Sequence, residues 1–392
     1  MSPDGARTLD DRLRARLTRW SADGLLRTLR PPSGVDLSSN DYLQLSSHPV
    51  VVSRFADAVR RSGAGSTGSR LLRGERESFT RLERRFAAFK GTASSRYFSS
   101  GYLANLAVLT TLPEAGDLIF SDERNHASLI DGARLSRAAT TVFAHSDVEG
   151  LRRLLARAAA GGPGRLCFVV VESLFSMDGD MAPLADYAEV CGRAGAALIV
   201  DEAHAVGIYG ERGSGLIERA GIGSAVTASI NTAGKALGVT GAFVAGSETA
   251  MAYLTQRARP FVFSTAPPPG VADGLEASLD LIEAEPERRR DLRERSRRAR
   301  ASLAAHGVDM LPGSSQILSV VIGDNDRAVR VAAMLQDEGF DVRAIRPPSV
   351  PEGTARLRIS LNVGVPDATF DTFAAALSKA LREAGVPCAV SS

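Results

Sequence analysis

Three short apolar runs constrain the fold of this chain most strongly. An unbroken apolar stretch occurs in each of residues 165–173 (RLCFVVVES), 195–204 (GAALIVDEAH) and 241–247 (GAFVAGS). A strand with one solvent-exposed face would instead alternate apolar and polar residues. A continuous apolar strand is buried on both faces, as in a parallel sheet covered by helices. Helical patterns lie between the runs, so we expect an α/β fold with a mainly parallel sheet.

The connecting segments carry helix signals. Residues 181–195 show apolar side chains at helical spacing and then stop at two glycines. A second helix is predicted after Ser146, which lies three residues before Glu149, the spacing of a capping box.

The composition changes after Pro286, where a long charged helix is predicted. Beyond it we expect a compact α+β unit of about 100 residues. The first 50 residues read as a helix followed by an extended segment. The sequence therefore predicts an N-terminal segment (1–50), a large domain (51–285) and a C-terminal α+β domain (286–392).

Charge and cysteine content exclude several classes of protein. Lys plus Arg number 47 and Asp plus Glu number 45, so a net charge of +2 gives no sign of a nucleic-acid or membrane partner. The arginines of residues 286–307 alternate with acids, which favours a solvated helix over a nucleic-acid arm. No apolar run is long enough for a membrane span, and no secretory signal is predicted. The three cysteines are far apart in the sequence, so neither a disulfide nor a zinc site is predicted. Free cysteines are typical of a reducing compartment, and we therefore expect a cytoplasmic location.

Polar residues follow the predicted strands, where open α/β sheets bind their ligands. Ser176 follows the first strand, and Asp201 and His204 follow the second. An acid at the end of a buried strand is costly unless a cation or a hydrogen bond meets it. Asp201 either caps a turn or faces a protonated heteroaromatic nitrogen.

Lys235 lies among small and apolar residues in SINTAGKALG (229–238), just after Thr232. Burial disfavours the charged form of a lysine and lowers its pKa. A neutral amine is the nucleophile that a covalent bond to a carbonyl cofactor requires. The alternative is a structural lysine whose stem is buried and whose head pairs with a carboxylate.

Two further segments are ambiguous alone. SSG (99–101) precedes a helix that starts near Tyr102, and a helix start can bind phosphate or simply turn the chain. His126 lies at another predicted helix start, as a cap or as a functional ring. Together with Asp201, His204, Thr232 and Lys235 they supply the groups that a pyridoxal phosphate site needs.

The same motifs resemble the α-oxoamine synthases, pyridoxal phosphate enzymes of the aspartate-aminotransferase fold (fold type I). The resemblance runs from LSSNDYLQLSSHP (37–49) to ARLRISL (355–361). It includes GSTGSRLLRG, SSGYLANLAVL, NHASLIDGARLS, ESLFSMDGDMAPL, VDEAHAVGIYGERGSG and TAGKALGVTGAFV. It implies a large domain with a mainly parallel seven-stranded sheet and a smaller α+β C-terminal domain.

The resemblance also implies roles for the cofactor site. Lys235 would hold pyridoxal phosphate covalently and act as the general base, Asp201 would pair with the ring nitrogen, and His126 would stack on the ring. His126 would also polarise the new carbonyl. His204 and Ser176 would contact the cofactor near its ring hydroxyl. The phosphate would be bound by Gly101, Tyr102 and Thr232.

The phosphate site would be completed by Ser264 and Thr265 of a partner subunit, so the resemblance implies a homodimer with shared active sites. For the substrates, Arg346 and Arg358 resemble the arginines that take the amino-acid carboxylate. The other expected substrate positions are Arg27, Asn40 and Ser349.

Residues 322–329 (IGDNDRAV) and 344–361 (AIRPPSVPEGTARLRISL) favour the branch of the family that condenses L-alanine with a pimeloyl thioester in biotin synthesis. The acyl carrier, coenzyme A or an acyl carrier protein, stays open. Another α-oxoamine synthase with a different amino acid or acyl group is an alternative. A non-catalytic scaffold of the same fold is a third, against which the intact Lys235, Asp201 and His204 argue.

Three positions depart from the family pattern. Ala233 replaces a bulkier residue, Ser349 replaces a threonine, and the segment between residues 30 and 36 is short. None of these changes removes a chemical group from the cofactor site. Ser349 and the short segment affect the region where the acyl chain is expected. The short segment also puts the usual N-terminal β-ribbon in doubt.

Overall fold

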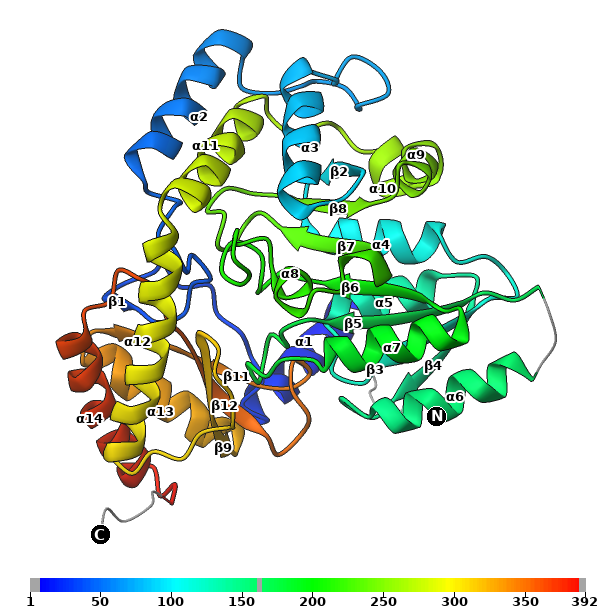
Figure 1. Ribbon diagram of the computed structural model, residues 1–392. Coiled ribbons are helices and arrows are strands. Elements are labelled where there is room, and N and C mark those ends of the chain that lie inside the picture. The colour runs from blue at the N-terminus through cyan, green and yellow to red at the C-terminus, as the bar shows by residue number, and fades with distance from the viewer. Residues whose placement is uncertain (1–7, 161–163, 388–392) are drawn as a thin grey trace.

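A seven-stranded sheet organises the middle of the chain (Figure 1). The computed structural model describes residues 8–160 and 164–387. In order across the sheet the strands are β2 (Ser94–Phe98), β8 (Ala242–Gly246), β7 (Val226–Thr232), β6 (Ala197–Asp201), β5 (Cys167–Glu172), β3 (Leu118–Asp122) and β4 (Ala139–Phe143). Strand β8 is antiparallel to both its neighbours and all the other pairs are parallel, which confirms the predicted sheet.

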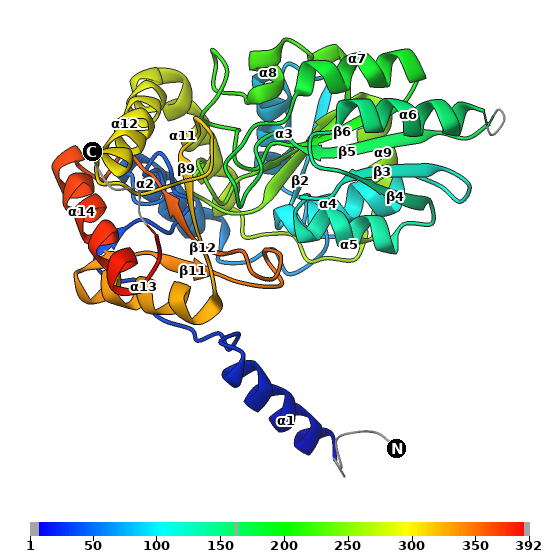
Figure 2. The same cartoon turned by 90° about the horizontal axis from the view of Figure 1, so that it is seen from below.

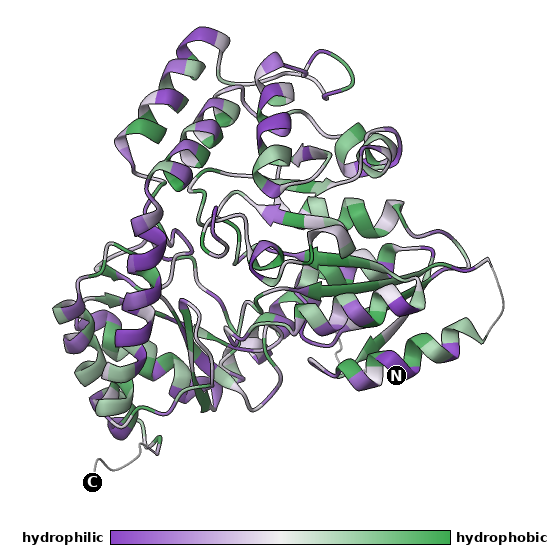
Figure 3. Ribbon diagram, viewed as in Figure 1, coloured by the Kyte–Doolittle hydropathy of each residue, from purple (hydrophilic) through white to green (hydrophobic). Residues whose placement is uncertain are grey.

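Both faces of this sheet are covered, as the unbroken apolar runs predicted. In β5, Phe168 and Val170 join one core cluster, while Val169 and Val171 join the other. The first face carries α4 (Gly101–Thr111), α5 (Ala127–Leu135), α9 (Glu248–Arg257) and α10 (Arg259–Val262). The second carries α3 (Glu77–Lys90), α6 (Val148–Ala159), α7 (Leu184–Ala194), α8 (Leu216–Ala220) and α11 (Gly270–Ala284). Figure 3 shows the hydrophobic strands between these helices.

Helix α6 does not begin as predicted. Its N-cap is Asp147, whose carboxylate accepts the Gly150 N–H at 2.8 Å. Ser146 lies outside the helix with φ of 57°, and its N–H donates to Asp122 at 3.0 Å. A carboxylate is available one residue later, so the predicted capping box does not form.

A smaller antiparallel sheet follows the long helix α12 (Pro286–Ala305). Its strands are, in order, β11 (Arg343–Ile345), β12 (Ala355–Ser360) and β9 (Ile317–Gly323). Helices α13 (Asn325–Asp337) and α14 (Asp367–Glu383) accompany it. Near it, β10 (Phe340–Asp341) pairs in parallel with β1 (Val35–Asp36), so the N-terminal segment adds a strand here. The domain boundaries at residues 50 and 285 stay a prediction.

The beginning of the chain is more exposed. Helix α2 (Pro49–Ser62) packs on α11, whereas α1 (Leu9–Ala22) extends away from the rest of the molecule in Figure 2 and has no buried residue. Within the part of the chain described, no helix is both long and apolar enough to cross a bilayer. Cys167 and Cys191 are free thiols, and Cys388 lies outside the described residues.

Candidate active site

Several polar side chains meet where the parallel strands end. Glu172 ends β5 and is paired with Asp201, which ends β6. Thr232 ends β7, and Lys235 lies in the turn that follows. Because the carboxyl ends of parallel strands share one edge, the topology brings these groups together.

The amine of Lys235 contacts an imidazole. Its Nζ lies 2.7 Å from Nε2 of His204, and the His204 Nδ1 lies 2.6 Å from the hydroxyl of Tyr42. Tyr42 in turn donates to Asn40 Oδ1 at 2.9 Å. This order makes His204 Nδ1 a donor and Nε2 an acceptor, so the neutral imidazole receives a hydrogen bond from Lys235.

The surroundings favour the neutral amine. Burial lowers the pKa of Lys235 to about 8, although Asp201 and Glu172 oppose the shift. Burial also holds the pKa of His204 well below its usual value, and the neighbouring Lys235 adds to this effect. A substantial fraction of Lys235 is therefore uncharged near pH 8, as a nucleophilic lysine requires.

Asp201 is fixed by two hydrogen bonds. Its Oδ1 accepts the Ala203 N–H at 2.8 Å, and its Oδ2 accepts Nδ2 of Asn105 at 2.7 Å. Asn105 comes from α4 and is almost fully buried. The carboxylate therefore has a set orientation at the sheet edge.

Asn105 also connects Asp201 to His126 through Ser128. Its Nδ2 lies 2.9 Å from Ser128 Oγ, which lies 2.7 Å from His126 Nδ1. The Ser128 backbone N–H donates to the same His126 Nδ1 at 3.2 Å. An N–H can only donate, so Nδ1 is an acceptor and the neutral ring carries its proton on Nε2. Burial lowers the pKa of His126, with a further contribution from Lys235, and this keeps the ring neutral.

Glu172 is a second buried carboxyl beside Asp201. Its Oε2 accepts the Ser176 N–H at 3.2 Å, and its Oε1 has no partner within the described chain. Burial and the neighbouring Asp201 raise the pKa of Glu172 to about 8. Glu172 is therefore mostly a neutral acid at pH 7 and can donate a hydrogen bond into the site.

The C-terminal unit contributes Arg358 and Gln316. Arg358 Nε donates to the Ser176 carbonyl at 2.5 Å, and its Nη2 donates to Asn40 Oδ1 at 3.0 Å. Gln316 Nε2 donates to the His204 carbonyl at 2.9 Å. Of the predicted substrate residues, Asn40 and Arg358 thus lie in the network around Lys235.

Two of the other predicted substrate residues, Arg27 and Arg346, join the N-terminal segment to the loop between β11 and β12. Arg346 donates to the carbonyls of Gly24 and Leu26, and Arg27 donates to that of Pro347 at 3.4 Å. Ser349 lines a cavity of about 640 Å³ that His126 and Ser176 also line. Arg27 and Arg346 therefore hold this loop, and Ser349 faces the space beside His126.

The phosphate was predicted at the start of α4. The Ser100 side chain accepts the Leu103 N–H at 3.2 Å, and a Cβ at Gly101 would lie only 2.6 Å from Thr232 Oγ1. Glycine therefore lets Thr232 approach the helix start, where N–H groups without helical partners attract anions. The side chain of Tyr102 points elsewhere, to Asp131. Ser264 is partly exposed and Thr265 is exposed, and Thr265 forms a backbone bridge with Ser69.

His145 fixes the loop that carries Ser176. Its two ring nitrogens lie 3.0 Å from Asp122 Oδ1 and 2.8 Å from Asp180 Oδ2. Burial alone would lower the pKa of His145, but the hydrogen bonds to these carboxylates raise it to about 9. The protonated ring thus ties β3 to the loop after β5.

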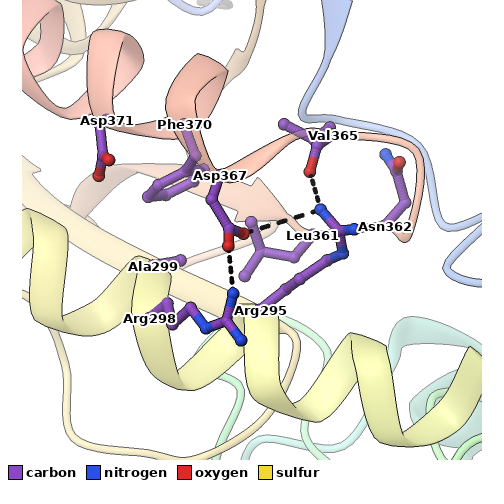
Figure 4. A pocket seen from close by; sticks show the side chains of 9 residues that line it. All are labelled: Arg295, Arg298, Ala299, Leu361, Asn362, Val365, Asp367, Phe370 and Asp371. Atoms are coloured by element: carbon purple, nitrogen blue, oxygen red, sulfur yellow. Dashed lines mark hydrogen bonds and ion pairs between the residues drawn. The ribbon is translucent and has the colours of Figure 1, made fainter. Parts of the chain in front are cut away.

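A second hollow, of about 230 Å³, lies between α12 and α14 and shares no lining residue with the cavity at His126 (Figure 4). Arg295 donates to the Val365 carbonyl at 2.5 Å and lies 3.7 Å from Asp367, which also pairs with Arg298. Its arginines are already paired with groups of the chain, so this hollow is part of the packing of the two helices.

The residues present fit pyridoxal phosphate. They offer an amine of lowered pKa, a fixed carboxylate, a neutral aromatic ring and a helix start beside a hydroxyl. Buried polar atoms without partners in the described chain, Glu172 Oε1 and Asn105 Oδ1, add hydrogen-bonding capacity. Sequence reasoning did not single out Tyr42, Asn105, Glu172 or Gln316, although Tyr42, Asn105 and Glu172 lie within the motifs that it quoted.

Comparison with known proteins gives consistent matches. A model of the family described as aminotransferase class I and II matches residues 32–377. The chain is 46% identical over 390 residues to the 8-amino-7-oxononanoate synthase of Anaeromyxobacter dehalogenans, covering 96% of this chain and 97% of that protein. It is 44% identical over 351 residues to the Paraburkholderia xenovorans enzyme of the same name, covering 88% of each.

Two solved structures are similar throughout. A serine palmitoyltransferase variant from S. paucimobilis with bound PLP matches with a TM-score of 0.89 and 28% identity, over 97% of this chain and 100% of that one. The 8-amino-7-oxononanoate synthase of Francisella tularensis matches with a TM-score of 0.77 and 27% identity, over 90% and 99%.

We predict that Asn105→Ala weakens the hold on the tautomer of His126, because Ser128 Oγ becomes free to accept from Nδ1 and only the Ser128 backbone N–H still opposes that tautomer. Ser128 Oγ and Asp201 Oδ2 each lose a donor, so the free energy of unfolding should fall by about 1–3 kcal/mol. In ¹⁵N spectra of histidine-labelled protein, the Nδ1 and Nε2 signals of His126 should move towards each other as the two tautomers mix. The chain has five histidines, and a His126→Gln variant assigns the signals.

Asn231→Ala is the matched control, because this buried asparagine donates to Ser229 and lies outside the connection between Asp201 and His126. Unchanged His126 nitrogen shifts in Asn105→Ala would show that Asn105 does not set the tautomer.

Proposed function

The chain belongs to the aminotransferase class I and II family, in its α-oxoamine synthase branch, and we propose that it acts as an 8-amino-7-oxononanoate synthase. It is a pyridoxal phosphate-dependent acyltransferase that joins L-alanine to a pimeloyl thioester. A bond forms between the alanine Cα and the thioester carbonyl carbon, the C–S bond breaks to release the thiol, and the alanine carboxyl leaves as CO₂. The observation that carries the proposal is the amine of Lys235, lowered in pKa and bonded to a neutral His204.

When bound, pyridoxal phosphate supplies an electron-accepting ring that stabilises negative charge at the amino-acid Cα. In our proposal Lys235 holds the cofactor through its amine and takes the Cα proton as a base. Asp201, oriented by Asn105 and Ala203, keeps a ring nitrogen protonated. The start of α4 and the Thr232 hydroxyl take the phosphate.

The substrates are assigned to the surrounding groups. We assign the carboxylate of L-alanine to Arg358, which lies in the Lys235 network and would exchange its Nη2 hydrogen bonds to Asn40 and Tyr42 for the carboxylate. His126 Nε2–H donates to the carbonyl oxygen of the acyl group, as a neutral donor whose tautomer is fixed. Ser349 lies where the acyl chain enters beside His126. Coenzyme A and an acyl carrier protein are both compatible with this arrangement.

We also propose a homodimer with shared sites. Ser264 and Thr265 follow Phe263, which is 72% exposed. A hollow of about 950 Å³ beside α4, α9 and α10 is lined by Phe263, Tyr253 and three arginines. A large exposed aromatic beside a hollow is typical of a protein–protein contact, and there the two hydroxyls would reach the partner's phosphate.

A second candidate is another α-oxoamine synthase. The serine palmitoyltransferase structure superposes with a higher TM-score than the Francisella enzyme. Sequence identity favours the first candidate, at 46% against 28%. Turnover with L-alanine, glycine and L-serine, each with several acyl thioesters, separates the two. Any condensation product also excludes a non-catalytic scaffold.

Lys235→Ala should abolish covalent capture of the cofactor. The chain has only three lysines, Lys90, Lys235 and Lys379, and the other two pair with Glu202 and Glu338. After borohydride treatment with pyridoxal phosphate, mass spectrometry should find the added mass at Lys235 in the wild type and at no lysine in the variant. Turnover of L-alanine and pimeloyl-CoA should fall at least about 1,000-fold.

Lys379→Ala serves as the control and should keep both capture and turnover. The assignment would be refuted if the Lys235→Ala variant still bound the cofactor covalently at the site. It would also be refuted if borohydride treatment labelled Lys90 or Lys379 in place of Lys235.

A mixed dimer tests the shared sites. One subunit carries Lys235→Ala, and the other carries Ser264→Ala with Thr265→Ala. With shared sites, one site collects both defects and the other collects neither, so cofactor titration should find one site of wild-type affinity per dimer. Sites formed within single chains would each carry one defect, and no site of wild-type affinity would then be found.

A further inference from the structure

The cavity beside His126 continues past the groups assigned so far. Besides His126, Ser176 and Ser349, its wall includes Ile130, Phe175, Met177, Leu311, Val321 and Val350. The loop between β11 and β12 forms one side and reaches towards the start of α5 (Figure 2). Such a wall suits a chain of methylene groups, because the apolar side chains bury the apolar surface of the substrate away from water.

Three charged side chains stand on the same wall: Arg124, Asp178 and Arg356. The Asp178 carboxylate pairs with both guanidiniums, one at each oxygen. The group therefore carries one positive charge in excess. Glu123 also lines the cavity and balances that charge, and its Oε1 accepts the backbone N–H of His145 at 3.1 Å. The hydrogen-bond donors left free, and not the net charge of the wall, therefore decide where an anion can bind.

The two arginines differ in how many of their hydrogen-bond donors are unused. Arg356 is 7% exposed, and its remaining donors bond to the carbonyl and hydroxyl of Thr354 at 3.0 and 3.1 Å. Arg124 is 49% exposed and uses only Nη1, towards Asp178. Within the described chain its Nε and Nη2 make no hydrogen bond. These two N–H groups form the fork that matches a carboxylate.

We propose that Arg124 binds a carboxylate at the far end of the acyl chain, so that the cavity selects a dicarboxylic acyl group over a simple fatty acyl group. This inference rests on the proposed function and names the feature of the acyl substrate that the chain reads. The apolar wall takes the methylene groups, and the Nε and Nη2 donors of Arg124 take the terminal carboxylate. Arg356, held by Thr354, fixes Asp178, which in turn positions Arg124.

Pimeloyl-CoA and heptanoyl-CoA provide the test, because they have seven-carbon chains that differ only in the terminal carboxylate. Both are assayed with L-alanine in the holoenzyme. Arg124→Met should lower kcat/KM for pimeloyl-CoA by about 10-fold or more, the effect of losing a hydrogen bond to a charged group. It should change the value for heptanoyl-CoA by less than about 2-fold. Arg124→Lys keeps the positive charge but lacks the two parallel N–H donors. Its kcat/KM for pimeloyl-CoA should lie between the values for the wild type and Arg124→Met.

Arg193→Met is the matched control, since it removes an exposed arginine that pairs with Glu189 on α7, remote from the cavity. Inhibition constants for both thioesters are measured in parallel, so slow turnover of either does not hide the comparison. Equal losses for both thioesters, or no loss for either, would overturn the proposal while leaving the proposed function intact. If wild-type protein makes no product from pimeloyl-CoA and L-alanine, the proposed function fails, and this inference fails with it.

Discussion

The contact between Lys235 Nζ and His204 Nε2 is the interaction on which the site depends. A buried ammonium is stable only with a carboxylate partner, and Lys90 has one in Glu202. Lys235 instead meets a neutral imidazole, and within the described chain no carboxylate lies within ion-pair distance of its amine. Burial without a direct counter-charge lowers its pKa, and an amine of lowered pKa is what the proposed role of Lys235 needs.

The fold brings three parts of the chain to this amine. The large sheet places Glu172, Asp201 and Thr232 along one edge because β5, β6 and β7 run in parallel. The N-terminal segment contributes Tyr42, which sets the protonation of His204, and the C-terminal unit contributes Arg358. Pairing of β1 with β10 joins those two parts of the chain.

Much of this arrangement was accessible from the sequence, for a physical reason. Unbroken apolar strands fix a sheet buried on both faces, and the residues after each strand then fall at one edge, which identified Asp201, His204 and Lys235. The connection from Asp201 to His126 through Asn105 was not accessible, because it depends on how closely α4 and α5 pack. Glu172 ends an apolar strand just as Asp201 does, so the cost of a buried acid could have identified it as well. Ser146 was wrongly predicted as a cap because spacing cannot show that Asp147 competes for the same N–H groups.

The central claim is that a substantial fraction of Lys235 is neutral near pH 8, and its titration tests this most directly. Protein freed of cofactor is acetylated briefly at pH 6 to 10, and the labelling rate at each of the three lysines is read by mass spectrometry, with the exposed Lys379 as the reference for the reagent. The account predicts a midpoint for Lys235 near 8. A midpoint at or above about 10.4, the value of an ordinary lysine, would contradict it.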